Sequence, residues 1–202
     1  MCIRDSWNTE SEKMESIDEL DDEGMRSFRR NMQMIFQDPY ESLNPRWTIK
    51  DIIKEPLDIH NIGALNDREE AVIEILRTVG LTPPENYLAR YPHEISGGQR
   101  QRVSIARTLI MKPKFVICDE PTSMLDVSIR ISIMDLMLNL AKDLNVSYLY
   151  ITHDLAVARY MCNRIAVMFN GKIVEIADTE ELLNNPIHPY TKRLISSIPI
   201  PD

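Results

Sequence analysis

Residues 115–153, FVICDEPTSMLDVSIRISIMDLMLNLAKDLNVSYLYITH, contain the pattern that decides the fold. The apolar run Phe115–Cys118 is followed at once by two acids and is typical of a strand buried on both faces of a parallel sheet. The stretch from about Val127 to Leu144 predicts a helix, and Ser147–Ile151 predicts a second strand. Together they form a βαβ unit, for which we expect a right-handed crossover.

Strands and helices alternate on both sides of this unit. Upstream, residues 32–36 predict a strand and residues 49 to about 92 are expected to be largely helical. A further helix is predicted from Ser96 to about Met111. Downstream, residues 164–175 predict a hairpin, because Asn170-Gly171 suits the positive φ angles of a type I′ turn. The pattern therefore predicts an α/β fold.

Composition and charge narrow the class of protein. The chain has 202 residues, 44% of them hydrophobic, which fits one mid-sized globular domain. No window approaches the roughly 18 uninterrupted apolar residues that a membrane span needs. The net charge is −8, and residues 1–25 carry nine acids against two basic residues. There is no basic field along the chain, so we expect no nucleic-acid partner.

Three side chains follow the predicted parallel strands. Asp119 and Glu120 come directly after one strand, and His153 comes shortly after the next. Open parallel sheets bind ligands beyond the carboxyl ends of their strands. An aspartate there can hold Mg²⁺, and a neighbouring glutamate can orient an attacking water. The alternative, taken from these residues alone, is a strand that simply ends in two solvated acids.

The segment Ile95-Ser96-Gly97-Gly98-Gln99 predicts the start of a helix that could also bind an anion. Ser96 is a good N-cap, and Gln99 three residues later completes a capping box. The two glycines allow another molecule to approach the backbone, and free N–H groups at a helix start attract anions. The alternative is a well-capped helix without a ligand.

These motifs together resemble the ATPase subunits of ABC transporters. Ile95–Gln99 with Arg100-Gln101-Arg102 is similar to the signature motif, and Phe115–Glu120 is similar to the Walker B strand. The other matching motifs are the Q-loop with Gln37, the D-loop Ser123-Met124-Leu125-Asp126, and the H-loop with His153. The segments FQDPYESLNPRWTI and NNPIHPYTKRLISSIP resemble the subfamily of dipeptide and oligopeptide importers. In that subfamily the second segment belongs to a carboxyl-terminal extension, whose Tyr190, Leu194 and Ile198 we expect to pack onto the domain.

The resemblance implies a role for each matched residue. Glu120 would polarise the hydrolytic water, and His153 would contact the γ-phosphate of ATP. Asp119 and Gln37 would hold Mg²⁺, with Gln37 also sensing the γ-phosphate. The residues implied to close over ATP bound to an opposite subunit, and to couple the two sites, are Ser96, Gly97, Gly98, Gln99 and Asp126.

The resemblance also implies a fold, partners and a location. The expected fold is a P-loop NTPase-like (RecA-like) parallel sheet with an inserted helical subdomain. Expected partners are a homologous or paralogous ATPase subunit and transmembrane permease subunits at the cytoplasmic face of the membrane, with a peptide-binding protein involved indirectly. The expected division of the chain is residues 1–36 leading into the Q-loop strand, 37–95 with the helical subdomain, 96–177 with the ATPase core, and 178–202 as the extension.

One family motif is missing from the sequence. A P-loop, or Walker A motif, requires G-x-x-x-x-G-K-[ST], and none of the six glycines belongs to such a pattern. We therefore expect an amino-terminally truncated ATPase that lacks the P-loop and the antiparallel β-subdomain and hydrolyses negligible ATP alone. The leading hypothesis is the ATP-hydrolysing subunit of a peptide importer. The alternatives are a non-catalytic donor of the signature motif to a partner ATPase, and a soluble ABC ATPase unrelated to transport.

Overall fold

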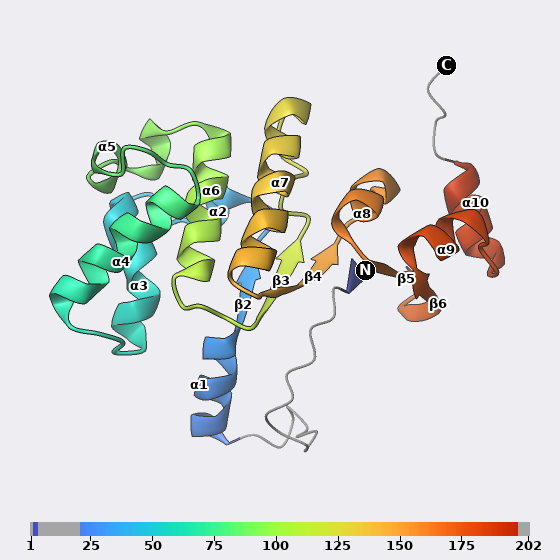
Figure 1. The fold of residues 1–202 in the computed structure, drawn as a ribbon, viewed down its shortest axis with the longest axis horizontal. Helices are drawn as coiled ribbons and strands as arrows, with labels where there is room; N and C mark the ends of the chain where they lie inside the picture. The colour runs from blue at the N-terminus through green and yellow to red at the C-terminus, as the bar shows by residue number, and fades with distance from the viewer. Residues whose placement is uncertain (1, 4–20, 198–202) are drawn as a thin grey trace.

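The computed structural model describes residues 2–3 and 21–197 of the chain. Within these residues, six strands form one mixed sheet in the order β2-β3-β4-β1-β5-β6 (Figure 1). The strands are β1 (Cys2–Ile3), β2 (Met32–Ile35), β3 (Phe115–Asp119), β4 (Ser147–Ile151), β5 (Arg164–Phe169) and β6 (Lys172–Asp178).

The strands β2, β3 and β4 are parallel and form the part of the sheet that carries the candidate site. Ile35 pairs with Cys118, and Cys118 pairs with Tyr150, so the three strands end at one edge. These residues share one face of the sheet and are at most 1% exposed. On the other face, Met34 is 36% exposed and Ile117 is only half-buried. The prediction that Phe115–Cys118 is buried on both faces is therefore wrong, because only one face of these strands is fully covered within the described residues. The parallel pairing predicted for the βαβ unit is confirmed. In contrast, the backbone of β1 pairs antiparallel with both β4 and β5.

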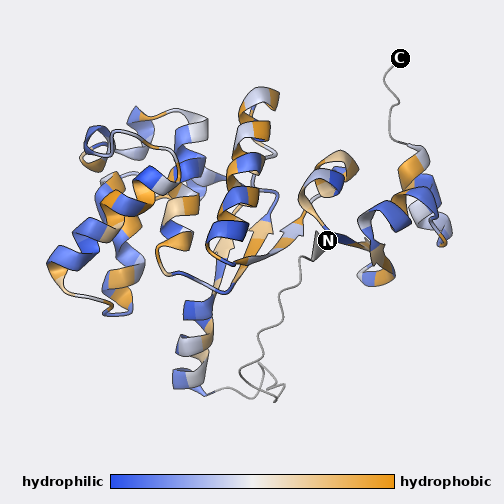
Figure 2. Ribbon diagram, in the orientation of Figure 1, coloured by the Kyte–Doolittle hydropathy of each residue, from blue (hydrophilic) through white to orange (hydrophobic). Residues whose placement is uncertain are grey.

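One helix connects the parallel strands β3 and β4. α7 (Val127–Asp143) is that connection; its inward side buries Ile133, Met137 and Leu140. The first helix, α1 (Asp22–Asn31), carries mostly hydrophilic residues (Figure 2), and none of its residues is buried. α1 leads directly into β2, so its last turn lies at the amino-terminal end of that strand.

The stretch predicted to be largely helical between residues 49 and 92 consists of three separate helices. They are α3 (Ile49–Ile59), α4 (Leu65–Thr78) and α5 (Glu85–Leu88). The break between α3 and α4 contains Asn61 and Gly63, whose φ angles of 52° and 71° no α-helix contains. Together with α2 (Pro39–Ser42), the 3₁₀ turn η2 (Pro92–Glu94) and α6 (Gly97–Leu109), they form the group of helices beside the sheet in Figure 1.

The carboxyl-terminal part of the chain forms the end of the sheet opposite β2. It contains α8 (Leu155–Met161), the β5–β6 hairpin, α9 (Thr179–Asn184) and α10 (Pro189–Ser196). Glu175 in β6 accepts hydrogen bonds from the backbone N–H groups of Ile187 and His188 and fixes the chain before α10. Tyr190 and Leu194 pack against the core as predicted, whereas Ile198 lies outside the described residues.

The predicted hairpin turn is confirmed. Asn170 and Gly171 have φ angles of 47° and 75°, and they connect Phe169 to Lys172. Both angles are positive, as a type I′ turn requires, and this turn matches the right-handed twist of the two strands.

Candidate functional site

Glu120 and His153, predicted to be catalytic, and Gln37, predicted to bind nucleotide and Mg²⁺, meet at the carboxyl ends of the parallel strands. Nε2 of Gln37 donates to Oε2 of Glu120 at 3.3 Å, and Nδ1 of His153 lies 2.6 Å from Oε1 of the same carboxylate. Gln37 follows β2, Glu120 follows β3 and His153 follows β4. Parallel register places these strand ends side by side, so residues far apart in sequence form one cluster. We call these three residues the carboxylate cluster.

The backbone at Glu120 is held in an uncommon conformation. Its φ angle is 43°, in the left-handed region that residues other than glycine seldom adopt. Its N–H donates to the carbonyl of Ile151 at 3.0 Å, and its own carbonyl accepts from both the backbone N–H and the hydroxyl of Ser123. These bonds turn the chain sharply after β3 and aim the carboxylate at Gln37 and His153. Uncommon backbone angles of this kind gather at functional sites.

The carboxylate changes the acid–base properties of His153. The hydrogen bond to Glu120, followed by the negative charge of that group, raises the pKa of His153 above its ordinary value. The imidazole is 76% exposed and the Glu120 side chain 21% exposed. The histidine ring therefore faces solvent, or a ligand approaching from solvent. Its Nδ1 atom is held by the hydrogen bond to the less exposed carboxylate of Glu120.

The donors beside this cluster fit a magnesium ion that is shared with phosphate groups. Asp119, the last residue of β3, offers a half-buried carboxylate, and the amide oxygen of Gln37 accepts no hydrogen bond within the described residues. Across those residues, no group of three or more His, Cys, Asp or Glu side chains could hold a metal without other ligands. Mg²⁺ is commonly bound by one or two carboxylates together with substrate phosphates. The residues present fit that mode of binding.

The predicted capping box at the start of α6 is confirmed. The N–H of Gln99 donates to Oγ of Ser96 at 3.3 Å, and the N–H of Ser96 donates to Oε1 of Gln99 at 3.0 Å. Nε2 of Gln99 also donates to the hydroxyl of Tyr87. None of these bonds reaches the carboxylate cluster. Within the described residues, the signature motif and the carboxylate cluster are therefore two separate parts of the candidate site.

The two signature glycines have different surroundings. A Cβ atom at Gly98 would lie 2.7 Å from Cγ2 of Ile129 in α7, whereas one at Gly97 would lie 3.8 Å from Leu125 of the D-loop segment. Real Cβ atoms essentially never make contacts as short as the first. Gly98 is thus required for the close packing of α6 against α7, a reason that the sequence alone does not give.

The D-loop residue Asp126 lies immediately before α7 and is exposed. Its carbonyl accepts from the N–H of Arg130 at 2.8 Å. The Arg130 guanidinium lies 3.8 Å from the carboxylate of Asp154, which follows His153 and caps α8. Arg130 therefore connects the D-loop side of α7 to the segment that carries His153.

The arginines of α6 make the contacts that sequence reasoning missed. Arg100 contacts Tyr40 in α2, and Arg102 donates to the carbonyl of Val79, close beside Gly80. Gly80 itself has a φ angle of 75°. The Arg100–Tyr40 pair spans 60 positions. The sequence pattern contains no signal for so distant a pair, although both residues stand inside recognised motifs.

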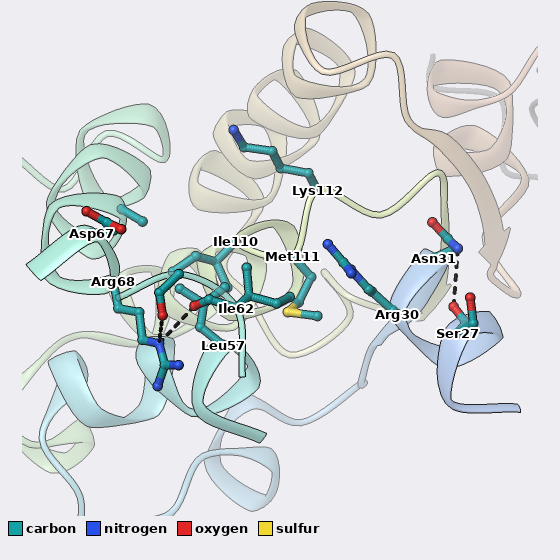
Figure 3. Close-up of a pocket in the computed structure, with 12 residues that line it drawn as sticks. Ser27, Arg30, Asn31, Leu57, Ile62, Asp67, Arg68, Ile110, Met111 and Lys112 are labelled. Carbon is teal, nitrogen blue, oxygen red and sulfur yellow. Dashed lines mark hydrogen bonds between the residues drawn. The ribbon is translucent and has the colours of Figure 1, made fainter. Parts of the chain in front are cut away.

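A cavity near the amino-terminal ends of the strands lies away from the carboxylate cluster (Figure 3). It has a volume of about 530 Å³ and is formed by the last turn of α1, the α3–α4 connection and the residues after α6. Arg68 closes one side by donating from Nε to the carbonyls of Ile62 and Gly63. These segments adjoin the amino-terminal ends of β2 and β3, whereas the carboxylate cluster lies at their carboxyl ends. A smaller cavity of about 80 Å³ adjoins Glu120 and His153.

Two models of protein families match parts of the chain. Residues 4–123 match the ABC transporter family, and residues 174–202 match the carboxyl-terminal region of oligopeptide/dipeptide transporters. The first match covers more than half of the sequence. The chain belongs to the ABC transporter family.

Within this family, the chain is similar to oligopeptide transport ATP-binding proteins. The chain is 49% identical over 189 residues to the oligopeptide transport ATP-binding protein AppF of Bacillus subtilis, covering 93% of this chain and 57% of AppF. It is 54% identical over 176 residues to the oligopeptide transport ATP-binding protein OppF of the same organism, covering 87% of this chain and 57% of OppF. The chain thus spans a little over half the length of these relatives.

Solved structures confirm the predicted P-loop NTPase-like fold class. The ATP-binding cassette MJ0796, in a dimeric post-hydrolysis state bound to ADP and Pi, matches with 31% identity and a TM-score of 0.67 over 80% of this chain and 69% of that chain. CbiO1 of Clostridium perfringens, part of the ABC transporter complex CbiONQ, matches with 27% identity and a TM-score of 0.72 over 82% of this chain and 64% of that chain.

Proposed function

We propose that this chain supplies ATP-hydrolysing elements of a subunit that powers the import of dipeptides or oligopeptides. The observation that carries the proposal is the carboxylate cluster, in which Gln37, Glu120 and His153 converge from three neighbouring strands. Its position beyond the carboxyl ends of parallel strands is where such folds bind their ligands. The names of the relatives, together with the match of residues 174–202, support peptides as the cargo.

Within this proposal, each residue of the cluster acts on a different part of the reaction. Glu120 orients the attacking water and accepts its proton while His153, hydrogen-bonded to the same carboxylate, directs its other ring nitrogen toward the γ-phosphate. Gln37 positions the carboxylate through its amide nitrogen. Asp119 and the amide oxygen of Gln37 would hold Mg²⁺, which when bound neutralises charge on the phosphates.

The signature motif serves a second nucleotide in this proposal. The start of α6, with Ser96, Gly97, Gly98 and Gln99, would close over ATP held by a homologous or paralogous subunit, and Asp126 would couple the two sites. The first N–H groups of a 13-residue helix provide a favourable site for phosphate. Support for a dimer also comes from the dimeric state of MJ0796.

The helices between residues 37 and 95 are the surface that we assign to the permease subunits. They carry a cavity of about 390 Å³ that is lined by α3 and Trp47, and the exposed fractions of Trp47 and Ile59 are 39% and 68%. Among the described residues there is no helix with the length and apolar character needed to cross a membrane. We place the subunit on the cytoplasmic face, bound to the permease, with a peptide-binding protein acting indirectly from the other side.

A fusion protein tests the proposal. Residues 22–202 would replace the matching part of Bacillus subtilis OppF, and the fusion would be expressed in a strain that lacks OppF. We expect uptake of a labelled tripeptide to be restored, and purified fusion to hydrolyse Mg-ATP. Glu120→Gln should abolish both activities while leaving the fold intact, because it keeps the size of the side chain but removes its negative charge and its ability to accept a proton.

The other outcomes separate the alternatives. ATP hydrolysis without uptake of any peptide would contradict the assignment to peptide import. Uptake that persists in the Glu120→Gln fusion would instead favour a chain that donates its signature motif to a partner and performs no chemistry at its own carboxylate cluster.

A further inference from the structure

A buried arginine joins the helix that follows Gln37 to the helix that begins with the signature motif. The guanidinium of Arg100 in α6 lies over the ring of Tyr40 in α2, with Cζ 3.6 Å from the ring centroid. Its Nη2 donates to the Tyr40 hydroxyl, and its Nη1 donates to the carbonyl of Pro92 at 2.9 Å. Arg100 is only 6% exposed.

The stability of α6 does not explain this position of a positive charge. Arg100 lies in the first turn of the helix, where the helix dipole disfavours a cation. A buried arginine is ordinarily paired with an acid, yet the contacts of Arg100 within the described residues are a ring, a phenol and a carbonyl. A guanidinium over the face of an aromatic ring is attracted by the negative charge of that face. The charge is therefore held by Tyr40 and the turn before α6.

The segment between Gln37 and Tyr40 is short and well fixed. The carboxylate of Asp38 caps α2 by accepting from the N–H of Tyr40 at 2.7 Å, and Pro39 between them is buried. A displacement of Gln37 should therefore displace Tyr40 as well.

A second arginine of α6 fixes the other end of α2. Arg107 donates to the carbonyl of Ser42 at 2.9 Å and pairs with Glu55 at 2.8 Å. α2 is thereby held on α6 at two points one heptad apart, and the two helices should move together.

We propose that Arg100 is a positioning residue that couples the Gln37 segment to the signature motif. Its contact with Tyr40 sets the start of α6 relative to the residue that holds Glu120, so the two parts of the candidate ATP site are aligned together. The purpose of this coupling rests on the proposed function. The coupling itself belongs to this chain in the absence of nucleotide, and can be measured there.

Hydrogen exchange of the unliganded 202-residue chain, followed by mass spectrometry, measures the coupling. Tyr40→Leu should raise exchange in residues 96–103 by about tenfold, because it removes both the stacking and the hydrogen bond that Tyr40 provides to Arg100 in the first turn of α6. Tyr40→Phe, which keeps the ring, should raise it less. Ser96→Ala, which breaks the capping box, should in turn raise exchange in residues 37–43, because coupling between two sites is mutual.

Two lysine variants decide whether Arg100 carries the effect. Arg100→Lys keeps the charge but loses the planar group that stacks on Tyr40, so in this background Ser96→Ala should no longer change exchange in residues 37–43. Arg102→Lys is the matched control on the same helix, since its parent contacts Val79 and Ser132, and here the effect should persist.

Persistence of the effect in Arg100→Lys, or its absence in the parent chain, would overturn the proposal. Thermal melting of each variant identifies any that fails to fold, and in that case Tyr40→Phe decides, because Tyr40 is 61% exposed and the change removes only its hydroxyl. Failure of the OppF fusion to transport peptide would contradict the proposed function and leave the exchange result unchanged.

Discussion

The Nδ1 atom of His153 lies 2.6 Å from Oε1 of Glu120, so an exposed histidine shares a hydrogen bond with the carboxylate proposed as the general base. This contact raises the pKa of His153. A raised pKa means that the stabilisation is fully present below the ordinary value of about 6.5 and is lost as the pH rises through the folded-state value. We expect Glu120→Gln to move the pKa of His153 back toward its ordinary value.

A titration of the histidine ring protons by NMR measures this shift, with the His153 signal assigned by its loss in His153→Gln. Asp119→Asn is the control, because that neighbouring carboxylate makes no contact with the imidazole. Identical titration curves for the parent chain and Glu120→Gln would mean that the pair does not form in solution.

Substitution by alanine should have different effects on folding stability at the two signature glycines, Gly97 and Gly98. Gly98→Ala forces a methyl group against Ile129, and overpacking of this kind costs about 1–3 kcal/mol of folding free energy. Gly97→Ala places its methyl group in ordinary van der Waals contact with Leu125, so the lower entropy of the unfolded chain should leave it neutral or up to about 1 kcal/mol more stable. Urea denaturation of both variants measures the difference. Ile129→Ala should partly rescue Gly98→Ala, and equal costs at the two positions would contradict the packing argument.

The hairpin turn isolates a purely conformational effect. Gly171 has a φ angle of 75° and no atom within 4 Å of an added Cβ, so Gly171→Ala should destabilise the chain by about 1 kcal/mol through backbone strain alone. Asn170→Gly should change stability by less, because asparagine already tolerates the left-handed region. The melting temperatures of the two variants test this order. A neutral Gly171→Ala would show that the turn relaxes to another type.

A buried hydrogen bond between two hydroxyl groups connects the segment after β3, the Walker B strand, to the neighbouring strand β4. Oγ1 of Thr122 and the hydroxyl of Tyr150 are 3.1 Å apart, and burial raises the pKa of Tyr150. Tyr150→Phe leaves the Thr122 hydroxyl without this partner and should cost about 1–3 kcal/mol. The double variant with Thr122→Val should cost less than the sum of the two single changes. Strict additivity in urea denaturation would show that the pair is not an interacting unit.

Local patterns predicted much of the fold and the position of the carboxylate cluster. The apolar run Phe115–Cys118 forms a strand as predicted, although only its alternate residues are fully buried, and parallel pairing brings Glu120 and His153 together. The Ser96–Gln99 capping box and the Asn170-Gly171 turn were predicted correctly because both depend only on residues within the motif. These features need no knowledge of distant contacts.

The features that sequence reasoning missed depend on distant contacts or on single backbone angles. The helices between residues 49 and 92 were not separated at Asn61 and Gly63, because left-handed angles at two positions leave only a weak mark in the sequence. The contact of Arg100 with Tyr40 and the packing of Gly98 on Ile129 arise only when helices meet in space. The assignment of domain boundaries and of individual catalytic roles stays a prediction.

The surroundings of Gly80 limit how this part of the sequence can diverge. Its φ angle excludes most side chains, and a Cβ would lie 2.8 Å from Nη1 of Arg102. A change at either position therefore disturbs the other, since the arginine occupies the volume that the glycine leaves empty. Evolutionary drift here should be paired: lineages that lose the arginine can accept asparagine or a small residue at position 80, whereas lineages that keep it retain glycine.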